Sequence, residues 1–271
     1  MVSKISTKSS SRRSDPIGVF DSGIGGLSVL RELERLMPHE RFIFFADQAH
    51  VPYGGKTATQ LKRYTSSITR FLVAKRCKIV VVACNTGTVY AIEHLRKTFR
   101  VPFVGTVPAI KPAARMSATG TVAILSTPAT AVSPALKALV HRHAADARVL
   151  RVGCPGLEEM VERGITSGPE MDVALRRHLG RAMRAGADVI VLGCTHYPFL
   201  KRSIRRISGS RTLDSGTAIA RRTRDVLAAA DLLRISGKGG SLFYTNGSPA
   251  AFSRVAGKLL HRPAPSRAIS V

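Results

Sequence analysis

Two cysteines occupy matching positions in two similar segments of the chain. The segments Ile79-Val-Val-Val-Ala-Cys84-Asn-Thr86 and Val189-Ile-Val-Leu-Gly-Cys194-Thr-His196 each contain an apolar run, a small residue, a Cys and a nearby Thr. An apolar run of this length, followed by polar residues, is typical of a buried strand that ends just before the cysteine. Because the segments lie 110 positions apart, we interpret them as parts of two similar α/β halves rather than as repeats of a solenoid.

A thiol between a strand and a helix can become a reactive thiolate. The free N–H groups of the helix N-terminus favour negative charge, so we expect the pKa of each thiol to fall. Inverting the α-carbon of an amino acid needs a base on one face and an acid on the other, with the roles exchanged in the reverse direction. Cys84 and Cys194, one ionised and one protonated, would meet that need across a cleft. For Cys77 and Cys154 we favour the alternative interpretation of a small buried apolar residue.

Charged and titratable residues lie at the same strand ends, where open α/β sheets bind ligands. Asp21 ends the first predicted strand and could bind a substrate ammonium or assist a thiol. Either Asp21 or Ser22 could instead cap the following helix. His196, two positions after Cys194, could hydrogen-bond to a thiol or to the substrate and so tune proton transfer.

Neutral side chains complete the predicted site. Asn85, Thr86 and Thr195 adjoin the two cysteines and could donate hydrogen bonds to substrate carboxylates. The two threonines could equally be helix caps. The loop Pro52-Tyr53-Gly54 could bring its backbone close to a small ligand, although Tyr53 could also serve only in packing.

Strands and helices alternate along the chain, which predicts an α/β fold with mostly parallel sheets covered on both faces. After the last strand, residues 218–233 and 241–260 read as helical, with a short apolar break at 242–244. This final part could pack back on the first half. The predicted strands are 16–21, 42–46, 79–83, 101–105, 121–125, 149–152, 188–192 and 211–213, and the other predicted helices are 27–36, 59–75, 88–98, 135–143, 157–163, 171–185 and 200–207.

Composition limits the class of protein. The 271 residues are 44% hydrophobic, so a substantial core can form, and no apolar run reaches the length of a membrane span. Residues 1–14 are rich in Ser, Lys and Arg and read as a disordered tail rather than a secretory signal. Without an export signal, we expect the four cysteines to be reduced thiols in a cytoplasm.

The formal net charge of +25 is the feature that points away from small-molecule chemistry. Such a charge attracts polyanions nonspecifically at low salt, and it also attracts small acidic substrates. An ordinary solvated basic surface explains it equally, and no nucleic-acid-binding motif accompanies it. Binding of nucleic acid or of another protein therefore remains the alternative function from a different class.

Two common cofactor signatures are missing from the sequence. The turn Ser22-Gly-Ile-Gly-Gly26 lacks the last glycine of a dinucleotide fingerprint, because Ser28 stands in that position, and no phosphate-binding loop motif occurs. The cysteine spacings match no zinc site. We therefore predict neither a nucleotide nor a metal.

Together these clusters resemble the glutamate racemases of bacterial cell-wall synthesis, within the wider aspartate/glutamate racemase family. The matching segments, in order, are Phe20-Asp-Ser-Gly-Ile-Gly-Gly-Leu-Ser28, Asp47 with Val51-Pro-Tyr-Gly54, Ala83-Cys-Asn-Thr86, Val107-Pro-Ala-Ile-Lys-Pro112 and Gly193-Cys-Thr-His-Tyr-Pro-Phe-Leu200. The resemblance implies two pseudo-symmetric α/β domains with the active site in the cleft between them. We expect residues 15–108 and 217–271 to form the first domain and residues 109–216 to form the second.

The resemblance also assigns roles. It implies L-glutamate/D-glutamate interconversion without a cofactor, in the cytoplasm, to supply D-glutamate for peptidoglycan and cell shape, and it suggests a homodimer. Glu162, after Cys154-Pro155, takes the place of a further acidic catalytic residue. The implied catalytic residues are Cys84, Cys194, Asp21, His196 and Glu162, and the implied substrate contacts are Asp21, Ser22, Tyr53, Gly54, Asn85, Thr86, Thr195 and His196.

Three departures from the family pattern bear on the substrate. Gly87-Thr88 replaces the Ala-Ser expected after Thr86, Glu158-Glu159 interrupts an apolar stretch before Glu162, and the family's Gly-Asp turn is only loosely matched by Thr245-Asn-Gly-Ser248. None of these touches the two cysteines. An aspartate racemase, or a related amino-acid racemase with the same cysteine pair, is therefore the nearest alternative.

Overall fold

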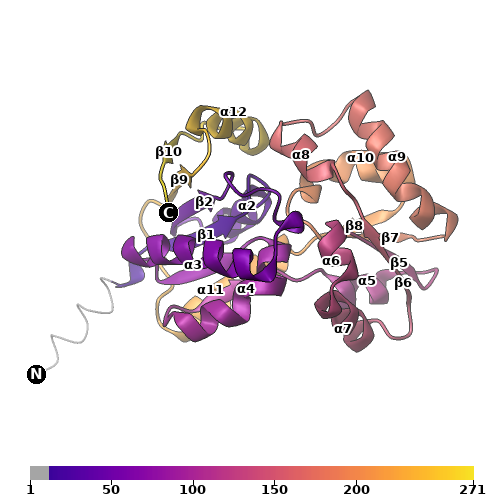
Figure 1. Cartoon of the computed structure of the whole chain (residues 1–271). Helices are drawn as coiled ribbons and strands as arrows, with labels where there is room; N and C mark the ends of the chain where they lie inside the picture. Colours follow the sequence, from indigo (N-terminus) through magenta and orange to yellow (C-terminus); the bar gives the residue numbers. More distant parts are fainter. Residues whose placement is uncertain (1–11) are drawn as a thin grey trace, which may run out of the picture.

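The computed structural model describes residues 12–271 of the chain, which fold into two lobes, each built on its own sheet (Figure 1). All the strand pairs in both sheets are parallel. The first sheet has the order β10-β9-β2-β1-β3-β4. Its strands are β1 (Ile17–Asp21), β2 (Arg41–Ala46), β3 (Ile79–Val82), β4 (Phe103–Gly105), β9 (Gly240–Thr245) and β10 (Ser266–Ala268).

The second sheet is smaller and has the order β6-β5-β7-β8. Its strands are β5 (Thr121–Ser126), β6 (Arg148–Gly153), β7 (Val189–Leu192) and β8 (Arg211–Leu213). The chain crosses to this sheet after β4 and leaves it after β8, so the second lobe is an insertion in the first. The expected mixed α/β fold with two mostly parallel sheets is confirmed, whereas the domain limits at 108/109 and 216/217 stay a prediction.

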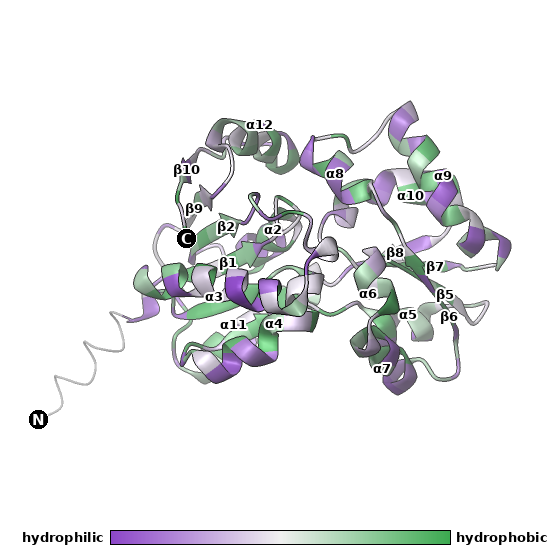
Figure 2. Cartoon of the chain, in the orientation of Figure 1, coloured by the Kyte–Doolittle hydropathy of each residue, from purple (hydrophilic) through white to green (hydrophobic). Residues whose placement is uncertain are grey.

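Helices accompany both sheets and mix polar with apolar residues, while strands such as β2 and β7 are largely apolar (Figure 2). Strands β1, β3, β5 and β7 are buried along their whole length, as strands covered on both faces must be. The helices of the first lobe are α2 (Leu27–Leu36), α3 (Ala58–Ala74), α4 (Asn85–Thr98), α11 (Gly216–Ala229) and α12 (Pro249–Leu260). Those of the second are α5 (Ile110–Met116), α6 (Pro128–Val132), α7 (Pro134–His143), α8 (Leu157–Glu162), α9 (Pro169–Arg184) and α10 (Lys201–Ser208).

The C-terminal part differs from its prediction. The supposed apolar break at 242–244 is the strand β9, which pairs with β2 so that Leu242 lies beside Ile43 and Phe243 beside Phe44. β10 then pairs with β9 and closes that edge of the sheet. The strand β9 was not predicted because only its last half is buried, so its apolar pattern is short. As expected, this part packs on the first half, since α11 also contacts α2.

The predicted N-terminal tail falls mostly on residues that the structure does not describe, and its last residues, 12–14, belong to the described structure. Residues 1–11 lie outside the described residues, but Arg12 and Arg13 are helical and part of the folded lobe. The Arg13 side chain forms an ion pair with Asp231, and its carbonyl oxygen accepts a hydrogen bond from Lys78 Nζ at 2.7 Å. Among the described residues, no helix is long and apolar enough to cross a membrane.

Candidate active site

The carboxyl ends of the two sheets meet at a small cavity. About 230 Å³ of the space in and at the mouth of this cavity is free of protein atoms, so the cavity is tight. Nine of the eleven predicted site residues line it. The lining residues are Ser22, Tyr53, Gly54, Cys84, Asn85, Thr86, Thr127, Glu158, Cys194, Thr195 and His196.

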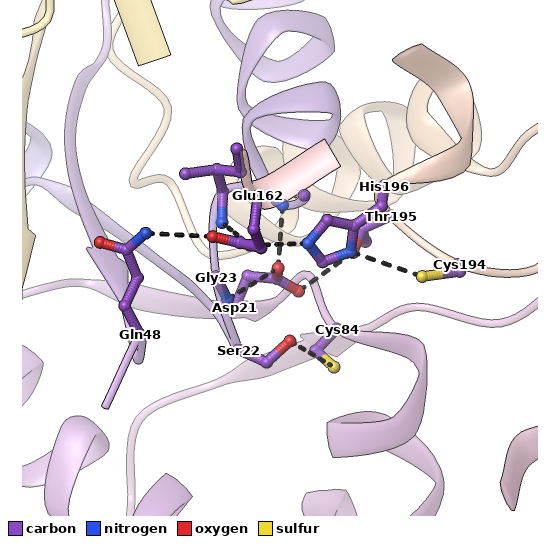
Figure 3. Close-up of polar contacts among 12 residues, drawn as sticks. Asp21, Ser22, Gly23, Gln48, Cys84, Glu162, Cys194, Thr195 and His196 are labelled. Atoms are coloured by element: carbon purple, nitrogen blue, oxygen red, sulfur yellow. Dashed lines mark hydrogen bonds and ion pairs between the residues drawn. The ribbon is translucent and has the colours of Figure 1, made fainter. Parts of the chain in front are cut away.

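Cys84 belongs to the first lobe and is held at the start of a helix. It follows β3 and is the N-cap of α4, where its Sγ accepts a hydrogen bond from the N–H of Gly87 at 3.3 Å. Its Sγ lies 3.8 Å from the Ser22 hydroxyl oxygen, to which the thiol can donate (Figure 3). Burial, reinforced by the charge of Asp21, raises the pKa of this thiol well above 9. Cys84 is therefore held in its protonated form.

Cys194 belongs to the second lobe and faces a different partner. Its Sγ lies 3.5 Å from Nδ1 of His196 (Figure 3). Burial raises the pKa of the Cys194 thiol, but the imidazole opposes this shift. Of the two thiols in the cavity, Cys194 is thus the one whose ionised form has a cationic neighbour.

His196 in turn is fixed by Glu162. The Nε2 of His196 lies 2.7 Å from Glu162 Oε1, and this carboxylate also accepts hydrogen bonds from the Ile24 N–H at 2.7 Å and from Gln48 Nε2 at 3.0 Å. Burial alone would lower the pKa of His196, but the hydrogen bonds to Cys194 and Glu162 outweigh it and hold that pKa well above 6.5. Likewise, burial would raise the pKa of Glu162, and the His196 hydrogen bond reverses the shift to a net lowering. The three side chains form a thiol–imidazolium–carboxylate chain.

The prediction that helix N-termini lower both thiol pKa values is wrong. Both thiols are buried, at 5% exposure for Cys84 and 6% for Cys194, and desolvation of the thiolate outweighs the nearby N–H groups. Cys194 is also not at the start of a regular helix. A 3₁₀ turn, η2 (Tyr197–Leu200), separates it from α10, so its compensating charge comes from His196 instead.

Asp21 lies beside the site but forms no hydrogen bond with either thiol. Its Oδ2 accepts hydrogen bonds from the N–H groups of Gly23 and Gly26, at 3.2 and 3.0 Å, and so anchors the turn that leads into α2. Its Oδ1 accepts a hydrogen bond from the Thr195 hydroxyl at 3.2 Å, which ties the two lobes together. Complete burial raises its pKa, against the opposing charge of His196. Asp21 acts on Cys84 through its charge rather than through contact.

The glycines of the Ser22–Gly26 turn are explained by close approach of the opposite lobe. A Cβ at Gly23 would lie 1.9 Å from Glu162 Oε1, and one at Gly25 would lie 2.5 Å from His196 Nδ1 and 2.7 Å from Thr195 Oγ1. This turn is therefore a surface against which the thiol–imidazolium–carboxylate chain packs, not a phosphate-binding loop.

Gly25→Ala is expected to lower turnover by at least about tenfold, because the added methyl must displace His196 from Cys194. Gly55→Ala is the matched control, since a Cβ at Gly55 meets nothing within 4 Å. Steady-state rates of the two purified variants, compared at equal folded fraction by circular dichroism, check this. Unchanged turnover in Gly25→Ala would show that the close approach is not needed.

The remaining predicted residues hold the cavity walls together across the two lobes. The Thr86 hydroxyl lies 3.3 Å from that of Thr127 and 3.1 Å from that of Thr130. The Tyr53 hydroxyl donates to Asp47 at 2.5 Å, so this ring is fixed by more than packing. Neither Thr86 nor Thr195 caps a helix, which settles that alternative in favour of contacts between the lobes.

The side-chain oxygen of Asn85 is available to accept a hydrogen bond from a ligand. Its Oδ1 is the one buried side-chain oxygen or nitrogen in residues 12–271 that has no hydrogen-bond partner. The residue is 5% exposed and lines the cavity. A buried acceptor without a donor is unfavourable, so this oxygen is suited to a ligand ammonium or N–H group.

Sequence reasoning missed three residues of the site. Thr127 follows β5 at a strand end. The same signal identified the cysteines, so Thr127 could have been predicted from the sequence. Gln48 follows β2 and so had the same strand-end signal, whereas Glu158 lies in α8 and had none, since its place depends on how the lobes pack. Cys77 and Cys154 are absent from the cavity lining, and burial raises the pKa of each thiol to about 12. In the described part of the chain, no group of three His, Cys, Asp or Glu side chains could hold a metal ion.

Comparison with known proteins identifies relatives over almost the whole chain. Residues 17–223 match the Asp/Glu/Hydantoin racemase family. A glutamate racemase of Herpetosiphon aurantiacus is 43% identical over 246 residues, which cover 90% of this chain and 97% of that protein. The crystal structure of the Francisella tularensis glutamate racemase with D-glutamate superposes with a TM-score of 0.84 at 28% identity, covering 95% of this chain and 98% of that one. The Escherichia coli glutamate racemase, with L-glutamate and an activator, gives 0.80 at 32% identity, covering 93% and 97%.

Proposed function

This chain belongs to the Asp/Glu/Hydantoin racemase family, as an isomerase of its glutamate racemase group, and we propose that it interconverts L- and D-glutamate by proton transfer at Cα between Cys84 and Cys194. The observation that carries the proposal is the placement of these two thiols, one from each lobe, on the wall of one small cavity. Cys194 has a cationic neighbour in His196, so it is the easier of the two thiols to ionise, and a two-sided proton transfer needs one ionised and one protonated group.

In the proposed mechanism, the Cys194 thiolate removes the α-proton from one enantiomer while the Cys84 thiol donates its proton to the opposite face of Cα. The Cα–H bond to the first proton breaks, a new Cα–H bond forms, and the negative charge moves from Cys194 to Cys84. His196 stabilises the Cys194 thiolate, and Glu162 keeps the imidazole cationic and oriented. In the reverse direction the thiols exchange roles, assisted on the Cys84 side by Ser22.

The substrate would be held by neutral groups. Asn85 Oδ1 is free to accept a hydrogen bond from the ammonium group. Among the hydroxyl groups that line the cavity, those of Ser22 and Thr86 can donate to the substrate carboxylates, whereas the Thr195 hydroxyl donates to Asp21 and the Thr127 hydroxyl to Thr130. No Lys or Arg is among the residues of the described chain that line the cavity, so the carboxylates would be bound by hydrogen bonds rather than by cationic side chains.

We expect the purified protein to racemise L-glutamate without any added cofactor and to act on L-aspartate at least about 100-fold less efficiently. A site that holds both ends of its ligand by hydrogen bonds leaves polar groups unpaired when the ligand is shorter. Circular dichroism of the free amino acids, or chiral chromatography, follows both reactions. Faster racemisation of aspartate than of glutamate would overturn the substrate assignment and favour the related racemase.

We further propose that the D-glutamate formed supplies peptidoglycan synthesis. The similarity to curated glutamate racemases over 90% of the chain supports this role. Expression of the chain in a bacterium that needs external D-glutamate should restore growth without it, and the Cys84→Ser variant should not. Growth that still depends on D-glutamate, despite active protein in the extract, would argue against the role.

A further inference from the structure

Glu158 is a buried carboxyl group that faces the ligand cavity and that the mechanism above does not use. It lies in the first turn of α8, is 6% exposed, and lines the cavity together with both cysteines and His196. Within residues 12–271 its carboxyl group forms no hydrogen bond or ion pair with another residue. An ionised carboxylate in such a place would have its own backbone N–H as a donor but no cationic partner of its own, and burial makes its charge costly.

Most of the titratable groups around Glu158 are negative when ionised, so they disfavour the ionised form of its carboxyl group. The charges that act on Glu158, or on which it acts, are those of Cys194, His196 and Tyr197 after β7, Cys154 after β6, Asp21 at the end of β1 and Glu159 in its own helix. From α9, His178 reaches only the carbonyl oxygen of Pro155, just before α8. Among all these groups His196 is the one cation that faces the cavity, and it is already paired with Cys194 and Glu162. Burial, partly opposed by His196, raises the pKa of Glu158 to about 7.

Because the proposed substrate is a dicarboxylate, the protonation state of Glu158 affects its binding. Glutamate carries two carboxylates and one ammonium, so it enters with a net negative charge into a cavity without a Lys or Arg. An ionised Glu158 would repel it at close range and in a medium of low polarity. A protonated Glu158 would have one O–H donor and no such repulsion.

Building on the proposed function, we propose that Glu158 is a specificity residue: in its protonated form it admits the dicarboxylate and donates a hydrogen bond to one substrate carboxylate, and in its ionised form it excludes the substrate. Binding is therefore coupled to uptake of one proton when the free residue is ionised. Affinity for the substrate falls as the pH rises above about 7.

The direct test is the pH dependence of KM for L-glutamate in the wild type, Glu158→Gln and Glu159→Gln. Only the protonated fraction binds, so the wild-type KM should rise about 30-fold between pH 6 and pH 8.5. Gln is neutral and keeps an N–H donor, so Glu158→Gln should lose this rise, with the change in KM exceeding any change in kcat. Glu159→Gln is the matched control, because this neighbouring residue is exposed and does not line the cavity, and its KM should follow the wild type.

Calorimetry gives a second readout that needs no variant. Racemic glutamate, already at its chemical equilibrium, is titrated into the wild type at pH 8 in two buffers of different ionisation enthalpy. The difference in heat should correspond to uptake of about 0.9 proton per bound substrate, and the uptake should be near zero at pH 5.5.

Three results would overturn the inference. A wild-type KM that does not rise with pH, or that rises equally in Glu158→Gln, removes the proposed role. Tighter binding at high pH would mean that an ionised Glu158 binds the ammonium instead. In each of these cases glutamate is still turned over, so the proposed function survives. Absence of glutamate turnover at every pH would instead defeat the proposed function itself.

Discussion

Serine in place of either Cys84 or Cys194 is expected to lower kcat/KM for glutamate racemisation by at least about 1,000-fold. A hydroxyl group is far less acidic than a thiol, and the imidazole beside position 194 is held in its protonated form and so does not take the proton of a serine. The loss should be similar in both directions of the reaction, because each thiol serves as base in one and as acid in the other.

Cys77→Ser is the matched control for these variants. Cys77 is likewise buried, at 6% exposure, but it does not line the cavity and packs beneath β1 near Gly18. We expect its racemase rate to stay within about twofold of the wild type once folding is matched by circular dichroism. A Cys84→Ser or Cys194→Ser variant with near-normal rates would refute the two-thiol mechanism, as long as the Cys77→Ser control behaves as stated.

The second large effect is expected for His196→Asn, which should lower kcat by about 100-fold near pH 7.5. The substitution removes the cation that opposes the effect of burial on Cys194, so the pKa of that thiol rises further. A thiol that is harder to ionise needs a more alkaline solution to act as base. Part of the lost rate should therefore return as the pH is raised, and the kcat profile of the variant should shift upward in pH.

His178→Asn is the control, because His178 lies on α9 and hydrogen-bonds only to the carbonyl oxygen of Pro155, outside the cavity lining. Its kcat profile between pH 6 and 10 should match the wild type. A His196→Asn profile with the wild-type shape and height would mean that Cys194 does not depend on the imidazole for its ionisation.

The sequence predicted the strand ends well because the signal is local. Apolar runs of four to six residues identified β1, β3, β5 and β7, and Cys84 and Cys194, which follow β3 and β7, line one cavity. The strand β9 was missed because half of it is solvent-exposed and its apolar pattern is correspondingly weak.

Interactions between the lobes could not be predicted in the same way. The thiol pKa values were expected to fall because a helix N-terminus can be read from sequence, whereas the burial that outweighs it cannot. Glu158 appeared in the sequence only as a departure from a family pattern. Its position in the cavity follows from the packing of α8 against η2, which involves residues far apart in the chain.

The route of the α-proton in heavy water tests most directly whether two separate groups serve the two faces of Cα. L-glutamate is incubated with the wild type in D₂O, and early samples are separated into enantiomers and examined by mass spectrometry. With two thiols, the D-glutamate formed should carry deuterium at Cα while the remaining L-glutamate still carries protium. Early D-glutamate that retains the original protium would show that one group carries the same proton from face to face, and would contradict the account.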